Sequence, residues 1–378
     1  MRPLLLALVT LMALFAPRPS AAACSTAVPV RSLLGCLNTG LGAVETQLAT
    51  AEADISTLEA AAAADDAQIA DLEAQIASLE ASLAAAVFDA GGVPWLADYL
   101  AVDPTTDSIV FTGANVYVQN GDGATSAING VGNLIVGYDE DDGTRDKSGS
   151  HNLVVGKYHQ YSSFGGLVAG YYNSVLAPFT TVSGGYSNTA SGYYSSVSGG
   201  ENNVASGPSG SVSGGQYNTA SEGGSSVSGG YGNAASGYSS SVSGGYYNAA
   251  SGYYSSIFGG QYNVASGMSS AASGGSANYA SGNVSSVLGG TDNEASGEYA
   301  SVSGGKTNTA SGEIGSVSGG SRNTAGGYYS SVSGGYGNAA SAYSSSVSGG
   351  YRNVASGYFS SIFGGQYQTA TTDSSYAP

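Results

Sequence analysis

The C-terminal half of the chain consists of a 15-residue unit that recurs thirteen times without an insertion or a deletion. A short unit repeated at fixed spacing is typical of a solenoid, in which each unit forms one coil that stacks on the previous coil. We therefore predict a mainly β fold, a parallel β-roll or β-solenoid. The small apolar residue that marks each unit falls at Val182, Val197, Val212, Val227, Val242, Ile257, Ala272, Val287, Val302, Val317, Val332, Val347 and Ile362.

Three positions of the unit vary least, those of Val182, Asn188 and Ala190. Coils stacked at ~4.8 Å place equivalent residues in ladders along the rod. Val and Ala suit a thin interior, whereas Asn can hydrogen-bond within its own ladder and tolerates left-handed turns. We expect the glycines Gly184, Gly185 and Gly192 where the chain bends sharply. The first rungs of the three predicted ladders are Val182, Val197 and Val212, then Asn188, Asn203 and Asn218, then Ala190, Ala205 and Ala220.

Looser copies of the unit precede the regular ones. Residues 132–181 hold irregular repeats with apolar blocks at Leu134, Leu153 and Leu167, and residues 182–376 hold the regular repeats. One coil buries about one Val and one Ala, which hardly offsets the entropy lost when fifteen residues become ordered. Stability is therefore expected from stacking and from neighbouring chains.

Residues 41–88 have the heptad pattern of a coiled-coil stalk. Such a seam needs a partner helix for its burial, although a single amphipathic helix on a globular domain is the alternative. Ile at a with Leu at d favours two strands, and three strands stay open. The a positions are Leu41, Leu48, Ile55, Ala62, Ile69, Ile76 and Leu83, and the d positions are Val44, Ala51, Leu58, Asp65, Leu72, Leu79 and Ala86.

The N-terminus has the features of an export signal. Residues 1–23 combine Arg2, an apolar core and a run of small residues suited to cleavage, so they predict a signal peptide. The next segment, residues 24–40, contains Cys24 and Cys36, the two cysteines of the chain. In an exported protein they predict one disulfide, with lipidation of Cys24 or pairing between subunits as alternatives. No later segment is expected to span a membrane.

Residues 89–131 are predicted to connect helix and solenoid. Pro94 can start a short helix. An alternating pattern from Ile109 to Val118 ends at Asn120-Gly121, which indicates a β-hairpin turn.

The charge of the chain argues against some partners. The formal net charge is −17, from nine Lys and Arg against 26 Asp and Glu, and the basic residues form no cluster. Nucleic acid and anionic membranes need a basic face, so neither is expected as a partner.

Catalytic and metal-binding patterns are weak. The run Asp139–Asp142 with Asp146 lacks the spacing of a calcium loop and is interpreted as a solvated acidic loop. Nothing in the sequence positions His151 or His159 for catalysis. We expect no enzyme activity, no metal and no cofactor.

Tyrosine is the main candidate for a binding surface, because it offers contact area at low entropic cost. Tyrosines that cover strand edges and stack on one another are the alternative. The candidate residues are Tyr186, Tyr193, Tyr194, Tyr246, Tyr247, Tyr253, Tyr254, Tyr328 and Tyr329.

Units such as SSVSGGYYNAASGYY at 240–254 and the block Leu134–Gly137 resemble the head repeats of YadA-like trimeric autotransporter adhesins. The resemblance covers about residues 130–370 and implies a trimeric left-handed parallel β-roll that attaches to surfaces. The chain departs from that family because its coiled coil precedes the head, and we expect no C-terminal membrane anchor.

These features predict an exported fibrous protein of bacterial type, at the cell surface or outside the cell. We expect a homotrimeric adhesin that binds host matrix, glycans or other cells through a Tyr/Ser-rich head, with extracellular protein or glycan as ligand. The alternatives are an ice- or crystal-binding β-solenoid, for which the outward Ser ladder from Ser183 is the candidate face, and a receptor-binding fibre.

Overall fold

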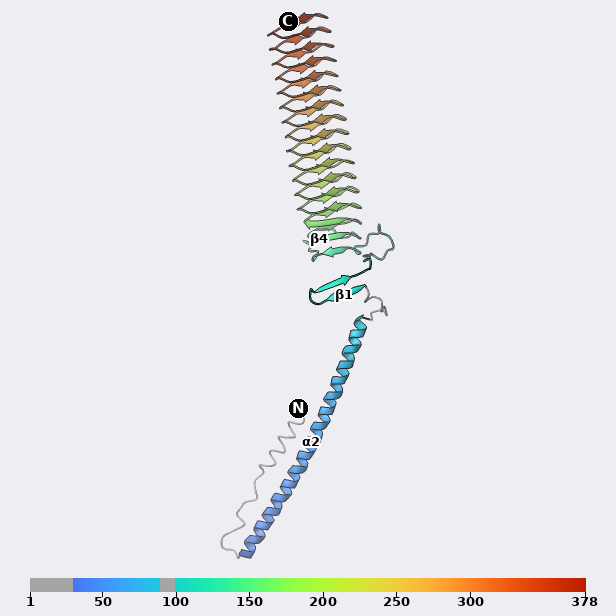
Figure 1. Cartoon of the computed structure of the whole chain (residues 1–378), viewed down its shortest axis with the longest axis vertical. Coiled ribbons are helices and arrows are strands. Elements are labelled where there is room, and N and C mark those ends of the chain that lie inside the picture. Colours follow the sequence, from blue (N-terminus) through green and yellow to red (C-terminus); the bar gives the residue numbers. More distant parts are fainter. Residues whose placement is uncertain (1–29, 89–98) are drawn as a thin grey trace. The chain divides into compact units, whose positions relative to one another are not determined.

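The computed structural model describes residues 30–88 and 99–378, with one long helix and a stack of short strands (Figure 1). The chain divides into two compact units, Met1–Asn115 and Val116–Pro378, which are described separately. The predicted signal peptide 1–23, Cys24 and the short helix predicted at Pro94 lie outside the described residues.

The first unit contains helix α2 (Val30–Phe88), 59 residues long. It begins before residue 41, where the stalk was predicted to start, because the heptad spacing continues backwards through Leu37 and Leu34. The seam residues are exposed, for example Leu34 at 67% and Ile69 at 53%. A single chain therefore leaves the apolar stripe of this helix uncovered.

A short hairpin follows the helix. Strand β1 (Leu100–Asp103) pairs antiparallel with β2 (Ser108–Phe111). The Asp103 carboxylate closes the turn by accepting hydrogen bonds from the Thr105 amide at 2.9 Å and from the Thr106 hydroxyl at 2.9 Å. The hairpin turn predicted at Asn120-Gly121 was wrong, because residues 116–118 form no strand and Asn120 belongs to the cap of the solenoid.

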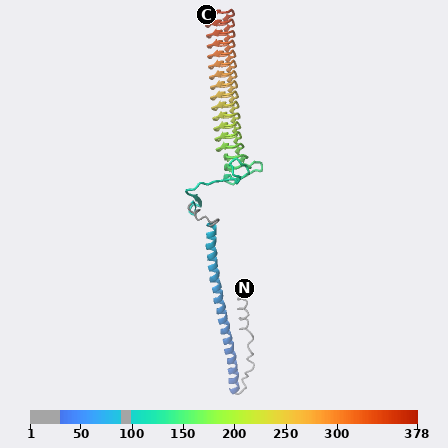
Figure 2. The same ribbon diagram turned by 90° about the vertical axis from the view of Figure 1, so that its right-hand side faces the viewer.

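The second unit is a parallel β-solenoid of about 16 turns with 15-residue repeats, as the spacing predicted (Figures 1 and 2). Its Val sheet contains β3 (Leu134–Val136), β4 (Leu153–Lys157) and β6 (Leu167–Tyr171), each paired with the next. From β8 (Thr181–Val182) onward the sheet continues every 15 residues through β10 (Ser196–Val197) to β32 (Ser361–Ile362) and β34 (Tyr376–Ala377).

The opposite Ala sheet contains β5 (Gln160–Tyr161) and β7 (Ser174–Val175). From β9 (Thr189–Ala190) it too continues every 15 residues, through β11 (Val204–Ala205) to β31 (Val354–Ala355) and β33 (Thr369–Ala370). All pairs are parallel and in identical register, so Val197 lies beside Val182 and Val212, and Ala205 beside Ala190 and Ala220.

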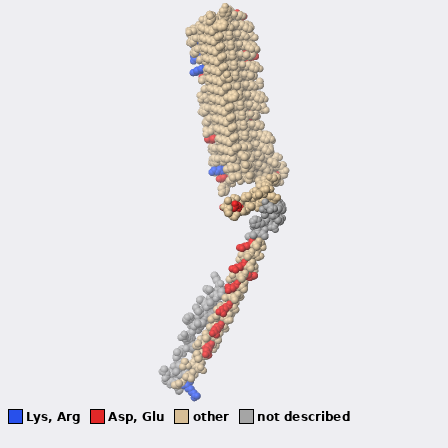
Figure 3. Space-filling model, viewed as in Figure 1, with Lys and Arg blue, Asp and Glu red and all other residues tan. Residues whose placement is uncertain are grey.

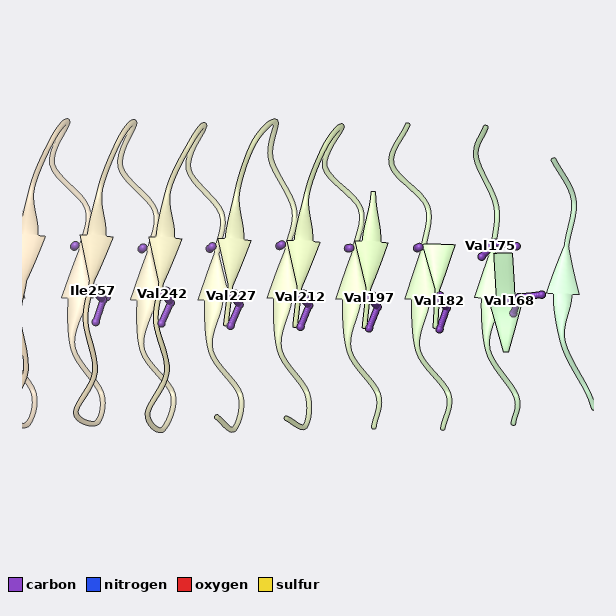
Figure 4. Close-up of a cluster of buried hydrophobic side chains, with 14 of the residues drawn as sticks. Val168, Val175, Val182, Val197, Val212, Val227, Val242 and Ile257 are labelled. Atoms are coloured by element: carbon purple, nitrogen blue, oxygen red, sulfur yellow. The ribbon is translucent and has the colours of Figure 1, made fainter. Parts of the chain in front are cut away.

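Each sheet contributes one buried side chain per coil to the core of the solenoid. Val182 and Val197 are 0% exposed, and so are Ala190 and Ala205 on the opposite sheet. Figure 4 shows the side chains of the Val sheet pointing the same way in consecutive coils, at Val182, Val197, Val212, Val227, Val242 and Ile257. The alternation of strands places Val inward and its Ser neighbours outward, which explains the short apolar signal in each unit.

The glycines of the unit differ in what they provide. Gly185 has φ +84°, and a β-carbon there would lie 2.2 Å from the Gly200 carbonyl oxygen. Gly192 lies so close to the next coil that its β-carbon would be 2.1 Å from the Gly207 oxygen. Gly184 also lies at a bend, as expected, but its φ is not left-handed and a β-carbon there would meet nothing within 4 Å.

Candidate binding surface of the head

The Asn ladder closes one turn of every coil and lies inside the solenoid. Asn203 is 0% exposed, and its side-chain amide donates to the carbonyl oxygens of Gly199 at 3.0 Å and Gly215 at 2.8 Å. Its Oδ1 accepts the backbone N–H of Asn218 at 3.0 Å. The sequence suggested that Asn of the ladder adopts the left-handed backbone of the turn. In the structure the residue before it does so, for example Asn202 with φ +54°. The ladder therefore satisfies buried backbone groups and offers nothing to a ligand.

His159 occupies the position of Asn in an early coil. It is fully buried, its Nδ1 accepts the Asn173 N–H at 3.3 Å, and its Nε2 lies 3.0 Å from the Val155 carbonyl oxygen. This pattern needs one acceptor and one donor, which is the neutral imidazole. Burial lowers the pKa of His159 and favours the same form. The imidazole thus replaces the Asn amide as a structural group.

The acidic loop has partners within its own chain. Asp139 accepts from the Tyr161 hydroxyl at 2.7 Å and lies 3.0 Å from the Lys147 ammonium. Hydrogen bonds from Thr144 and then Tyr172 lower the pKa of the Asp142 carboxyl to about 2. Burial, with the Asp139 hydrogen bond, raises the pKa of Tyr161. Among the described residues no group of three or more His, Cys, Asp or Glu side chains could hold a metal.

The N-terminal end of the solenoid is covered by a polar cap. The Asn129 side-chain amide donates to the Asn120 carbonyl oxygen at 2.9 Å, and the backbone N–H of Asn129 donates to Ser150 Oγ at 3.0 Å. His151 Nε2 accepts the Asn120 N–H at 3.3 Å, and its Nδ1 lies 3.0 Å from the Thr125 oxygen. His151 therefore holds the cap, a role that its isolated position in the sequence did not indicate.

The tyrosines lie along the two narrow edges of the solenoid, where the chain turns between its sheets. Tyr186 and its equivalents, with the residue that follows each, form the first tyrosine edge, which is joined by single parallel bridges such as Tyr231 to Tyr246. Tyr193 and Tyr194 with their equivalents form the second tyrosine edge. The candidates on the first edge are Tyr186, Tyr246 and Tyr247, and those on the second are Tyr193, Tyr194, Tyr253, Tyr254, Tyr328 and Tyr329.

The rings on both edges are stacked and exposed at once. Tyr231 and Tyr246 stack with centroids 5.3 Å apart, and Tyr247 and Tyr262 are parallel at 5.9 Å. Tyr246 remains 41% exposed and Tyr254 58% exposed. Stacking covers much of the ring faces, so these ladders present mainly hydroxyls and ring edges to solvent.

Hydroxyl contacts couple some of these rings. The hydrogen bond between the Tyr328 and Tyr329 hydroxyls raises the pKa of Tyr328 to about 12, and the one between Tyr193 and Tyr194 raises the pKa of Tyr193. The phenols are therefore neutral donors and acceptors at neutral pH, which suits polar protein or sugar groups.

Backbone strain is concentrated at the same edges. In every regular coil the second residue of each edge has a left-handed backbone, for example Tyr247 with φ +51° and Tyr254 with φ +57°. Glycine would take this conformation without strain, yet large side chains often stand there. Large side chains at these positions therefore retain backbone strain that glycine would avoid.

The aromatic residues form bands along the rod. Coils between about residues 217 and 262 and again between 328 and 367 carry most of them, whereas the coils between carry Asp292, Glu298, Lys306 and Arg322 on the same edges. In Figure 3 the charged atoms on the visible side of the head lie sparsely against a large uncharged surface.

No protein-family model matches the chain, and no curated protein sequence matches it significantly. Within residues 30–88 and 99–378, no helix is both long and apolar enough to cross a membrane. Cys36 lies in α2 and is not a free thiol. Because Cys24 lies outside the described residues, the predicted Cys24–Cys36 disulfide stays a prediction.

Proposed function

We propose that the chain is an exported fibrous surface protein that adheres through its head, with several copies held together by a coiled coil of α2. The observation that carries the proposal is the pair of exposed tyrosine edges repeated along a stiff rod. Each edge offers weak sites at one-coil intervals, and joined copies multiply them, so affinity would come from multivalency. The resemblance of the repeats to YadA-like heads supports three copies.

The exposed seam of α2 supports the coiled coil. Its a and d residues from Leu34 to Leu79 are apolar except for Asp65, and all but the half-buried Ala51 are exposed in the single chain. A helix of this length gains stability by burying such a stripe against copies of itself. Replacing Ile69 and Leu72 by Lys should reduce the solution mass of the chain to that of a monomer, whereas Gln68→Lys, outside the seam, should leave it unchanged.

Adhesion is tested with the mature chain on arrays of matrix proteins and glycans. We expect binding, and an at least tenfold loss when Tyr246, Tyr247, Tyr253 and Tyr254 are all replaced by Ser. Serine already stands at positions equivalent to Tyr246, Tyr247 and Tyr254, namely Ser276, Ser187 and Ser239, and small or polar residues such as Gly223 and Asn283 stand at positions equivalent to Tyr253, so the fold should survive. Tyr279→Thr, on the Ala sheet rather than an edge, is the control. Equal binding by the fourfold variant would refute the role of the edges.

The Ser ladders of the Val sheet favour ice or crystal binding as a second candidate, because hydroxyls recur on a flat sheet. Phe258, Leu288 and Phe363 project from the same ladder and are 63%, 58% and 66% exposed, which interrupts a flat lattice match. We expect no thermal hysteresis in an ice-growth assay.

A further inference from the structure

The outer side of the Val sheet has a composition unlike the rest of the head. It consists of the residues equivalent to Thr181, Ser183 and Gly184 in each regular coil, which we call the serine–glycine face. Between residues 181 and 364 these three positions hold Ser, Thr, Ala, Gly, Phe or Leu and no charged residue. The charged residues of the regular coils lie mainly on the tyrosine edges, as at Glu201 and Arg352.

The glycine of this face is not explained by contacts within the chain. At twelve of the thirteen equivalents of Gly184 an added β-carbon would meet nothing within 4 Å, and at Gly244 the nearest atom would be 3.9 Å away. At Gly199, Gly214 and Gly229 the backbone is not left-handed either. The coils thus keep glycine where the single chain has space for a side chain. These glycines are half-buried on the outer side of the sheet, and the absence of a side chain there allows close approach from outside.

Three large apolar side chains interrupt this otherwise small face. Phe258, Leu288 and Phe363 are each more than half exposed, at 63%, 58% and 66%. They lie at the same position of the unit, the one that Ser183 occupies in its own coil. If copies of the chain lie parallel and in register, each of these residues meets its own equivalent. The three side chains would then be buried between the copies, and the rest of the face would not need to change.

We propose that the serine–glycine face is the surface along which copies of this chain pack, turned toward the axis that the copies share. The proposal rests on the oligomer proposed above, because the exposed seam of α2 gives the copies a common register. The absence of charge on the face disfavours a charged ligand, and the projecting Phe and Leu side chains disfavour a flat lattice. A second copy satisfies both observations.

The size of the face fits an interface that needs the stalk. Thirteen coils at ~4.8 Å and a width of about three strand residues give roughly 600 Å² per copy. Stable interfaces bury about 800 Å² per partner. The head contact is therefore too small to hold copies together alone, and it should form only when α2 keeps them joined.

The test places single cysteines in the full mature chain, in which Cys36 is not a free thiol. Ser213→Cys and Ser228→Cys lie on the serine–glycine face, and Ser221→Cys on the outer side of the Ala sheet is the matched control. A short bismaleimide should join the first two between chains at least tenfold faster than the third. Equal or faster joining at Ser221→Cys would overturn the proposal.

A second set of variants tests the glycines. Gly199, Gly214 and Gly229 are replaced together by Asp, with Ser206, Ser221 and Ser236 replaced by Asp as the control. We expect the glycine variant to keep its oligomeric mass and circular dichroism. The rate of cross-linking at Ser243→Cys should fall at least tenfold. Undiminished cross-linking would overturn the proposal.

The solution mass separates the two proposals. A monomeric chain would overturn both the coiled coil and this interface. An oligomeric chain whose serine–glycine thiols do not cross-link would overturn this interface alone.

Discussion

Asn248, in the middle of the regular coils, is the residue of the Asn ladder at which we predict a large loss of stability on substitution. Its side-chain amide donates to the carbonyl oxygens of Gly244 and Gly260, each at 2.9 Å. Its Oδ1 accepts the Asn263 N–H at 3.0 Å. Gly260 also accepts the N–H of Tyr246 at 2.9 Å, so it keeps one partner without Asn248.

Asn248→Leu removes these three hydrogen bonds while keeping a similar volume. It leaves the buried Asn263 N–H and the half-buried Gly244 oxygen without their side-chain partner. An unsatisfied buried group costs about 1–3 kcal/mol and a half-buried one costs less, so the two together predict a loss of roughly 2–4 kcal/mol. At about 1.4 kcal/mol for each factor of ten, local opening should become at least tenfold more frequent.

Hydrogen exchange read by mass spectrometry measures this effect coil by coil. Stability of a repeat array is a sum of local terms, so the change should be confined to coils near residues 244–263. Ser243→Ala, exposed on the same coil, should change exchange little. Unchanged exchange in Asn248→Leu would show that the ladder amides do not satisfy the backbone as described.

Three further outcomes follow from the described geometry. Burial lowers the pKa of His159, so the unfolded chain takes up a proton first; the stability of that coil should fall as pH drops below about 6.5, and His159→Asn should abolish this dependence in pH-dependent hydrogen exchange. Gly237→Ala should lower the melting temperature because its β-carbon would lie 2.0 Å from the Gly252 oxygen, whereas Gly229→Ala should change it little; equal effects would contradict this. Val284 is β-branched with φ +52°, so Val284→Asn should raise stability by about 1 kcal/mol in chemical denaturation.

Much of the solenoid could be predicted because every regular coil repeats the same residue pattern and the same backbone conformation. Periodicity revealed the parallel stacking, and the constancy of Val and Asn matched residues that lie inside. The start of the helix at Val30 was missed, although Leu34 and Leu37 continue its heptads.

Other features needed coordinates. The sequence shows Gly184 and Gly185 as equals, but one has open space beside it and the other has φ +84° against the next coil. The exchange of Asn for His159 is visible only through shared hydrogen-bond partners. The Tyr residues were expected either to bind or to stack. The rings stack on one another and are still partly exposed, as at Tyr246, so binding stays a prediction.

The identical register of every rung also determines how the molecule can change length. Gaining or losing 15 residues would preserve every ladder of the regular coils. Coils of other lengths occur only among the irregular repeats, where Leu134 pairs with Leu153 and Leu153 with Leu167. Recombination between neighbouring units therefore adjusts the rod in steps of about 4.8 Å without creating a new fold. The length of the solenoid can vary by whole coils, while the surface residues of each coil can change independently.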